Sequence, residues 1–399
     1  MSSISTNSRQ PELRFSGFAG EWEEKTLGEV GVFVRGLSYS KGDVTTDESS
    51  TLVIRSNNII QDGAVDCKNG LQFVNKAPSS DQVLKKGDIV ICLSNGSSNL
   101  VGKSASFDGE YAGIATVGAF CGIYRSSAPI TKYLVQTQAY KKRIDLIKQG
   151  GNGALANLYG RDILGLKFLF PCYAEQQKIV ECLSSIDELI TVQDQKVMLL
   201  KERKRALLQQ LFPQNGETTP RLRFPGFTGE WEEKVFSDVC ITVTPPLKLQ
   251  SRDYLKGGKY PIVDQSQDLI CGWTNDERGV ISDNPVIIFG DHTCVLKYIA
   301  FPFVQGADGV KIIKTVEGYW PLFVYQSFLA NPINPNGYKR HFSDLKEKRF
   351  LFPKTLSEQK KIADCLATLD SIITTELLKS DELRAYKKGL MQQLFPFYK

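Results

Sequence analysis

The sequence predicts an α+β protein in which two mixed α/β domains are joined by two long antiparallel coiled-coil helices, with an internal pseudo-twofold repeat. Two pairs of matching peptides carry this prediction. LRFSGFAGEWEE at 13–24 returns as LRFPGFTGEWEE at 222–233, and FLFPCYAEQQKI at 168–179 returns as FLFPKTLSEQKKI at 350–362. Repeats of this length and order indicate a duplicated structural unit. Because the segments between the matched peptides differ, we expect two versions of one structural unit on a common framework.

Each repeat ends in a long predicted helix. Between Glu175 and Phe212 there is no glycine or proline, and apolar residues recur at alternating spacings of four and three. This period of about 3.5 residues predicts a seam against another helix. We favour pairing of the two repeats with each other over two separate helices that each lie on their own domain. Polar residues interrupt the seam and would then fix its register: Gln193 and Lys204 in the first repeat, and Glu376, Ser380 and Lys387 in the second.

The segments between the matched peptides are predicted to mix strands and helices. Apolar runs bounded by Gly, Asn, Ser and Pro indicate strands. These runs are TLVIRS, GDIVICLS and VGAFCGIYRS in the first repeat, and YPIVDQS, PVIIFG, TCVLKYI and GVKIIK in the second. The predicted helices are KYLVQTQAYKKRIDLI and WPLFVYQSFLA. The predicted domains are residues 1–173, a first spacer helix at 174–213, a second domain at 214–356 and a second spacer helix at 357–399.

Composition and charge indicate a soluble globular protein without a strong electrostatic bias. Hydrophobic residues make up 42% and charged residues 23% of the chain, as in ordinary soluble domains. The net charge of +5 only mildly favours a polyanionic partner. The polar start MSSISTNSRQ has the features of neither a signal peptide nor a membrane anchor, so a mobile tail is expected there. Nine scattered cysteines without a C-x-x-C pair favour a reducing cytoplasm, which is the predicted location.

The loop LSNGSSNLVGKSA at 93–105 follows a predicted strand and ends in G-K-S, as a phosphate-binding loop does. Gly96 and Gly102 stand one residue too far apart for that motif, and no helical period follows to complete an anion site. We therefore interpret the segment as an exposed polar loop, with an ordinary turn as the alternative. Its candidate contacts with phosphates or other polar groups are Ser94, Asn95, Ser97, Ser98, Asn99 and Lys103.

The second repeat offers a different loop, FGDHTCV at 289–295. A metal site would need more ligands at workable spacing, and the chain has only two histidines. A nucleophilic G-x-S-x-G elbow is also absent. Two interpretations stay open, a histidine satisfied at a strand end and a loop that reads bases. For the second, the candidate residues are Gln265, Gln267, Asp291, His292 and Thr293.

Two further loops precede the matched F-L-F-P in both repeats. They are GGNGALANLYGRD at 150–162 and NPNGYKRHFSD at 334–344. One such loop is usually a solvated turn, but two at the same place suggest a shared surface. The residues suited to phosphate or base contact are Asn157, Tyr159 and Arg161 in the first loop, and Tyr338, Lys339, Arg340 and His341 in the second.

Taken together, these motifs resemble those of the type I restriction–modification specificity subunits. The resemblance rests on L-R-F-x-G-F-x-G-E-W, on G-D-I-V-I-C-L-S-N-G-S with V-G-K-S-A, and on the endings EQ-x-K-I and L-x-QQLFP. It covers nearly the whole chain. It implies two target-recognition domains that each read one half of a split, asymmetric DNA site, held apart by two antiparallel helices. The tryptophans of the opening peptides, Trp22 and Trp231, would pack against a helix rather than contact DNA.

The resemblance also implies partners and assigns the chemistry to them. Two modification subunits that bind S-adenosylmethionine would methylate adenine at N6, and two restriction subunits that use ATP and Mg would complete the nuclease. This chain would then be a non-catalytic subunit that holds no cofactor or metal of its own. The rival interpretations are a self-contained P-loop ATPase or nuclease, and a coiled-coil scaffold that does not bind DNA.

Overall fold

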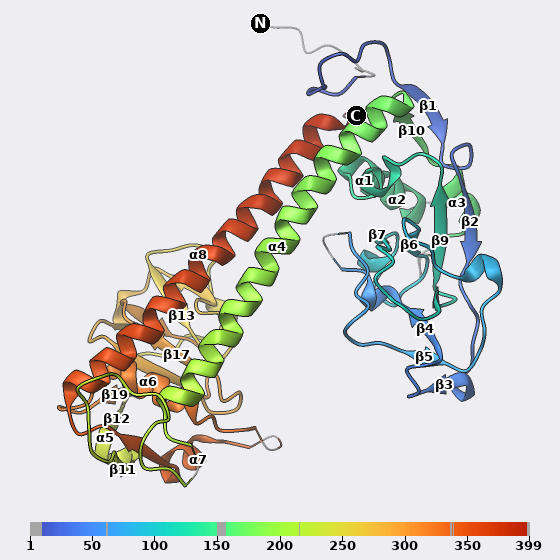
Figure 1. Ribbon diagram of the computed structural model, residues 1–399. Helices are drawn as coiled ribbons and strands as arrows, with labels where there is room; N and C mark the ends of the chain where they lie inside the picture. Colours follow the sequence, from blue (N-terminus) through green and yellow to red (C-terminus); the bar gives the residue numbers. More distant parts are fainter. Residues whose placement is uncertain are drawn as a thin grey trace, which may run out of the picture. The chain divides into compact units, whose positions relative to one another are not determined.

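The computed structural model describes residues 10–60, 63–149, 157–214, 216–335, 337 and 339–396 (Figure 1). Apart from Gln10, the expected mobile tail at 1–10 lies outside the described residues. The chain divides into two compact units. Unit 1 is Met1–Val192 with Ser380–Lys399, and unit 2 is Gln193–Lys379. Helix α4 (Tyr173–Leu211) begins in unit 1 and ends in unit 2, whereas α8 (Leu356–Leu394) begins in unit 2 and ends in unit 1. Each unit is therefore built on one half of each long helix.

Unit 1 contains two four-stranded sheets. The antiparallel sheet has the order β2 (Gly31–Arg35), β9 (Cys121–Ser126), β6 (Ile89–Cys92) and β7 (Ser104–Ser106). The mixed sheet has the order β3 (Val44–Thr45), β5 (Phe73–Val74), β4 (Thr51–Ile54) and β8 (Ala115–Val117), with β4 and β8 parallel. The helices are α1 (Thr131–Leu134), α2 (Gln138–Gln149) and α3 (Gly160–Leu164), and the 3-10 turns are η1 (Lys41–Asp43), η2 (Ser56–Asn58), η3 (Ser80–Gln82) and η4 (Ser98–Leu100).

Unit 2 repeats the antiparallel sheet and the parallel strand pair with other sequences. Its antiparallel sheet has the order β12 (Cys240–Val243), β19 (Val310–Thr315), β16 (Val286–Gly290) and β17 (Leu296–Ile299). Its mixed sheet has the order β14 (Gly272–Thr274), β13 (Tyr260–Val263), β18 (Phe303–Gln305) and β15 (Val280–Ile281), with β13 and β18 parallel. The fourth strand of this sheet, β15, pairs with β18, whereas β3 of unit 1 pairs with β5. The helices are α5 (Phe236–Val239), α6 (Pro321–Ala330) and α7 (Phe342–Glu347), and the 3-10 turns are η5 (Ser251–Asp253) and η6 (Glu277–Gly279).

The predicted strands and the helix WPLFVYQSFLA are confirmed, except that VGAFCGIYRS contains the turn between β8 and β9 and is a strand only from Cys121. The predicted helix KYLVQTQAYKKRIDLI is wrong as one element. It is two helices, α1 and α2, separated at 135–137. Thr137 accounts for the break. Its hydroxyl accepts a hydrogen bond from the Tyr140 N–H at 3.2 Å, which starts a new helix, and donates to the Leu134 carbonyl at 2.7 Å, at the end of the previous one.

The matched peptides form the frame on which each unit is built. In unit 1 the opening peptide ends in β1 (Glu23–Thr26), which pairs antiparallel with β10 (Lys167–Phe170), the F-L-F strand. In unit 2, β11 (Glu232–Val235) pairs with β20 (Arg349–Phe352) in the same way. Trp22 is 1% exposed and Trp231 is 4% exposed, each within a core that includes its unit's part of α4 and α8. The prediction that these tryptophans pack against helices is confirmed.

A buried ion pair fastens each opening peptide to the first turn of a long helix. The Arg14 guanidinium donates Nε and Nη2 to the two carboxylate oxygens of Glu175, both at 2.7 Å. Arg223 and Glu358 form the same bidentate pair in unit 2, at 2.8 and 2.9 Å. Both glutamates are almost fully buried. The peptide occurs twice in the sequence because each unit needs this clamp between its first strand and its helices.

Polar interruptions of the apolar seam contact the opposite long helix. The Gln193 side-chain amide donates to the Glu376 carbonyl at 2.8 Å and to its carboxylate at 2.7 Å. In unit 2 Lys204 pairs with Asp370 at 2.5 Å, and in unit 1 Lys387 pairs with Asp187 at 2.6 Å. As the residue number increases along α4 from 193 to 204, the number of the partner residue on α8 decreases from 376 to 370. The helices are therefore antiparallel. The predicted pairing of the two repeats is confirmed, and polar layers at shared positions distinguish this register from shifted ones.

Candidate nucleic-acid interface

Four loops of unit 1 meet at one end of its two sheets. They are 55–58 after β4, 93–97 after β6, the turn 118–121 between β8 and β9, and 157–161 at the start of α3, and we call them the unit 1 cluster. The Asn95 amide donates to the Ser56 hydroxyl at 2.7 Å. The Leu93 and Ser94 N–H groups donate to the Phe120 carbonyl at 2.8 and 3.1 Å. These bonds join three of the loops.

The fourth loop is fixed by main-chain and side-chain bonds together. The Leu158 N–H donates to the Leu93 carbonyl at 2.9 Å, and the Ser94 hydroxyl donates to the Asn157 side-chain oxygen at 2.6 Å. Ser94 and Asn157 are far apart in the sequence, and the sequence alone did not indicate their contact. A set of loops braced in this way on a rigid sheet can present polar groups in a fixed geometry.

The same four positions meet in unit 2, and we call 264–268, 291–294, 306–309 and 339–342 the unit 2 cluster. The Gln265 side chain accepts from the His292 N–H at 3.3 Å and donates to the Asp308 carbonyl at 3.1 Å. The Asp291 N–H donates to the Gly309 carbonyl at 2.6 Å, and the His341 N–H donates to the Asp291 carbonyl at 2.7 Å. The loops follow the equivalent strands β13, β16 and β18 and precede α7. One scaffold therefore presents different side chains in the two units.

The predicted loop 94–103 lies on the surface, and a lysine of α2 contacts its backbone. Ser97, Ser98 and Asn99 are exposed, whereas Ser94, Asn95 and Lys103 are partly buried. The Lys148 ammonium on α2 donates to the Ser98 and Val101 carbonyls at 3.3 and 3.4 Å. Strand β7, not a helix, follows the loop. The helix N-terminus that a nucleotide-binding P-loop requires is therefore missing here.

Tyr159 and Arg161 form a stacked pair beside Asn157. The Arg161 guanidinium lies 5.1 Å from the centre of the Tyr159 ring, and both side chains are exposed. The Tyr159 N–H donates to the Asp162 carboxylate at 2.7 Å, which holds the first turn of α3. An exposed guanidinium fixed against an aromatic face is suited to a phosphate or a base.

Two of the predicted residues in unit 2 lie in the interior. Asp291 is 2% exposed, and its carboxylate accepts from the Phe342 N–H at 2.9 Å and lies 3.8 Å from the Lys311 ammonium. His341 is fully buried, and its Nδ1 lies 3.0 Å from the Asp344 carboxylate. Hydrogen bonds from His341 and Lys339 lower the pKa of Asp344. Because they are buried and hold the loops together, we leave Asp291 and His341 out of the proposed contact surface.

The remaining predicted residues of unit 2 reach the surface. Gln267, Thr293, Lys339 and Arg340 are exposed and His292 is partly exposed. The His292 Nδ1 lies 3.3 Å from the Lys339 carbonyl, and the Thr293 hydroxyl donates to the Gln265 carbonyl at 2.8 Å. Gln265 has both ends of its side chain engaged within the cluster. Tyr338 lies outside the described residues.

Sequence reasoning missed the β8–β9 turn and its counterpart at 306–309. Phe120 at this turn is 70% exposed, although it lies in an apolar run that indicated a buried strand. Asp308 and the exposed Asn57 were missed as well. The only available signal was the pair of glycines in V-G-A-F-C-G and Q-G-A-D-G, which mark turns.

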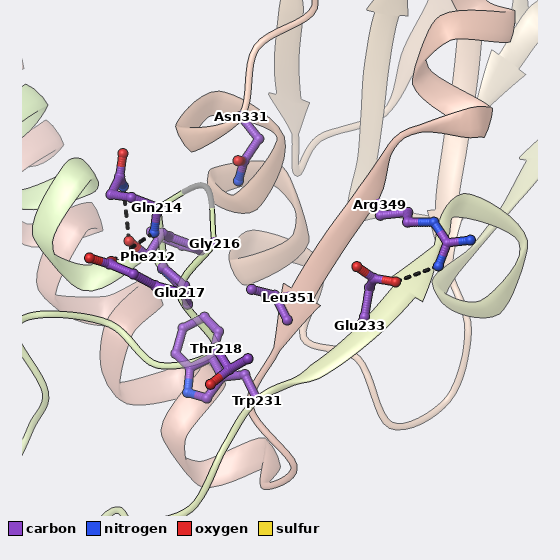
Figure 2. A pocket seen from close by; sticks show the side chains of 11 residues that line it. Phe212, Gln214, Gly216, Glu217, Thr218, Trp231, Glu233, Asn331, Arg349 and Leu351 are labelled. Atoms are coloured by element: carbon purple, nitrogen blue, oxygen red, sulfur yellow. Dashed lines mark hydrogen bonds and ion pairs between the residues drawn. The ribbon is translucent and has the colours of Figure 1, made fainter.

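A separate cavity of about 440 Å³ in unit 2 belongs to the frame (Figure 2). Figure 2 shows the Trp231 indole and Leu351 in its wall, with the ion pair of Glu233 and Arg349 to one side. Its lining shares no residue with the unit 2 cluster: Phe212, Pro213, Gln214, Gly216, Glu217, Thr218, Trp231, Glu233, Asn331, Arg349 and Leu351. Within the part of the chain that the structure describes, no group of three His, Cys, Asp or Glu could hold a metal ion. No helix among these residues combines the length and apolarity needed to cross a membrane.

The fold and the two clusters define a class: a duplicated protein with two loop clusters on a shared frame of long helices. The protein-family model described as type I restriction modification DNA specificity domain matches residues 19–201. The resemblance of this chain to the type I restriction–modification specificity subunits is confirmed over this segment.

Curated relatives align with about half of this chain. The specificity subunit of the type I restriction enzyme StySPI from Salmonella potsdam is 28% identical over 198 residues, 47% of this chain and 42% of the relative. The EcoKI specificity subunit of Escherichia coli (strain K12) is 28% identical over 213 residues, 51% of this chain and 44% of the relative. The chain thus spans less than half the length of these relatives.

Two solved structures share the fold over nearly the whole chain. The S subunit of a type I restriction–modification system from M. genitalium has a TM-score of 0.61 at 15% identity, covering 98% of this chain and 100% of that one. A chain from a structure on complex assembly and conformational transition of the type I R-M system has a TM-score of 0.51 at 16% identity, covering 94% and 97%. The predicted α+β architecture with its helical repeat is confirmed.

Proposed function

We propose that this chain is the sequence-specific DNA-recognition subunit of a type I restriction–modification complex. Each unit reads one half of a bipartite, asymmetric site in duplex DNA, and the helix pair fixes the gap between the halves. The single observation that carries the proposal is the duplicated four-loop cluster. Its strand ends and bracing bonds recur in both units, whereas its side chains differ.

Different side chains on one scaffold are what direct readout requires. Each base pair shows its own pattern of donors and acceptors in the major groove, so two half-sites need two sets of contacts. Unit 1 presents the Ser94–Asn157 pair and neighbouring hydroxyl and amide groups. Unit 2 presents His292 and Thr293. Arg161, Lys339 and Arg340 are suited to phosphates.

The long helices are the proposed docking surface for the partner subunits. Leu189 and Val192 in unit 1 are 56% and 62% exposed, and Leu199 and Leu378 in unit 2 are 60% and 58% exposed. Apolar side chains exposed along a helix suit an apolar partner helix. Two modification subunits with S-adenosylmethionine would methylate adenine at N6, and two restriction subunits with ATP and Mg would cleave. We assign no catalysis and no cofactor to this chain. The free cysteines fit the reducing cytoplasm that we propose as its location.

Replacing the interior of unit 2 tests the proposal. The exchange should cover residues 236–348, because this leaves β11, β20 and the clamp of Arg223 with Glu358 in place. The donor is the same segment of a related chain with another site, and the readout is sequencing of methylated adenines in cells that carry the complex. We expect one half-site to change and the other to stay.

The reciprocal exchange of residues 27–166 in unit 1 serves as the matched control and should change the other half-site. If either exchange alters both half-sites or neither, the assignment of one half-site to each unit is wrong. ATP turnover by the isolated chain would instead support the rival self-contained enzyme.

A further inference from the structure

Phe120 is the most unexpected side chain of the unit 1 cluster. A phenylalanine with 70% of its surface in solvent loses the favourable free energy of burial, and no described residue of the unit buries it. It lies at the third position of the β-turn 118–121, where the Cys121 N–H donates to the Gly118 carbonyl at 2.8 Å. Single exposed apolar residues are common, so exposure alone assigns no role.

The backbone of Phe120 is held rigidly in its exposed position. Its carbonyl accepts from both Leu93 and Ser94, and the next residue, Cys121, accepts from the Gly36 N–H at 3.2 Å. A Cβ on Gly36 would lie 2.1 Å from the Gly118 carbonyl oxygen, so β2 and the turn approach as closely as backbones can. The segments that follow β2 and β6 therefore both hold the turn, and this fixes the backbone from which the ring projects.

The loops joined to the Phe120 turn carry polar and cationic side chains. The carbonyl of Phe120 binds the loop that carries Ser94, whose hydroxyl contacts Asn157. Beyond Asn157 lie Tyr159 and its stacked Arg161. Arg35 at the end of β2 is exposed and has no ion-pair partner among the described residues. An exposed aromatic ring on a turn joined to loops with amide, hydroxyl and guanidinium groups suits DNA, because such rings stack on bases beside phosphate contacts.

We propose that Phe120 is a wedge that inserts at a base step of the first half-site and stacks on a base next to those contacted by Ser94 and Asn157. This inference rests on the proposed function of the cluster. Insertion partly unstacks the step and allows more of the polar loops to reach the DNA. The step itself becomes part of the specificity, because flexible pyrimidine–purine steps are opened more easily than others.

The equivalent turn of unit 2 has no such wedge. The equivalent turn at 306–309 carries Ala307 and Asp308, and its two glycines bring it close to Tyr254 and Gln265. A carboxylate there would be repelled by phosphates and is suited at most to a base amino group. The two half-sites are therefore distorted differently, and only the half-site of unit 1 is opened.

The test uses the full chain purified with its modification subunits and duplexes that carry the methylated site. 2-Aminopurine, whose fluorescence rises when it is unstacked, replaces one base at a time in each half-site. The variants are Phe120→Ala, Phe120→Trp, and Val32→Ala as the control, since Val32 is 60% exposed near the opposite end of the same sheet. Thermal melting of each variant checks that it is folded.

The wild-type complex should raise the fluorescence at one step of the unit 1 half-site and nowhere in the other. Phe120→Ala should abolish this rise and weaken binding about 5- to 150-fold, the range for loss of one stacked base. Phe120→Trp should keep both, and Val32→Ala should match the wild type.

Three results would overturn the inference. A folded Phe120→Ala complex with wild-type fluorescence and affinity would remove the wedge while leaving the DNA-recognition function intact. Loss of the modification subunits from this variant on gel filtration, with unchanged DNA binding by the chain, would make Phe120 a protein contact. Failure of the wild-type complex to bind the duplex at all would refute the proposed function, and the wedge with it.

Discussion

Lengthening both long helices by one turn should lengthen the gap between the two half-sites. The change duplicates residues 191–194 in α4 and residues 374–377 in α8. Both copies of Gln193 then find a copy of Glu376 in the antiparallel partner, so the polar layer between them is doubled rather than broken. The pairs of Lys204 with Asp370 and of Lys387 with Asp187 lie on either side of the duplication and stay intact.

The size of the effect follows from helix geometry. Four residues add about 6 Å at 1.5 Å per residue, and they rotate the helix by about 40° beyond a full turn. Bases along one strand are spaced by about 3.4 Å, and each turns the groove by about 35°. The preferred gap should therefore grow by about one or two base pairs. The bases read in each half-site should stay the same, because neither cluster is altered.

The assay is sequencing of methylated adenines in cells with the altered chain and its partner subunits. The matched control duplicates 191–194 in α4 alone. This shifts one helix by four residues, so the pairs Lys204–Asp370 and Lys387–Asp187 can no longer form together, and the melting temperature should fall. An unchanged gap in a folded, active complex with both duplications would refute the view that the helix pair sets the spacing.

Three further predictions concern single side chains. Arg223→Ala leaves the buried Glu358 carboxylate without its ion-pair partner and should cost about 3–5 kcal/mol of unfolding free energy in unit 2. Urea unfolding measures this loss. A loss below about 1 kcal/mol, as for a surface ion pair, would contradict the prediction. Hydrogen bonds, chiefly from Gln193 and then from two lysines, lower the pKa of Glu376 from 4.5 to about 2. Its carboxylate thus stabilises the fold above pH 4.5, and this contribution is lost as pH falls toward 2, so Glu376→Gln should flatten the acid side of a melting-temperature profile; an unchanged slope would argue against it. His292→Ala should relax one half-site by about 1–3 kcal/mol of discrimination, and unchanged methylation by a stable variant would remove His292 from the contacts.

Repetition and periodicity determined the frame from the sequence alone. The matched peptides located the two repeats, and the 3.5-residue seam located α4 to within two residues of both ends and α8 to within one residue of its start, although α8 ends at Leu394, before the predicted end at 399. These features are legible because they are local: helix propensity and apolar spacing act over neighbouring turns of one segment. The polar interruptions at Gln193 and Glu376 were also visible, although the sequence did not say that they bind each other.

The sequence located most of the loops of the candidate interface, but not which of their side chains are exposed. It singled out the loops that carry Ser94, Asn157 and His292, because Gly, Asn and Ser clusters end apolar strands. It could not distinguish Asp291, which is buried, from Thr293, which is exposed, since both stand in one short loop.

Only the tertiary structure decided which loops meet and which side chains face solvent. Phe120 belongs to an apolar run, yet its turn lies at the end of a sheet where none of the elements described in the structure buries it. Its exposure depends on strand order, in which β8 and β9 lie in different sheets and the chain must turn between them. Contacts between residues that are distant in the chain, such as Ser94 with Asn157, depend on how the sheets and α3 pack. The spacing of residues along the sequence does not indicate such contacts.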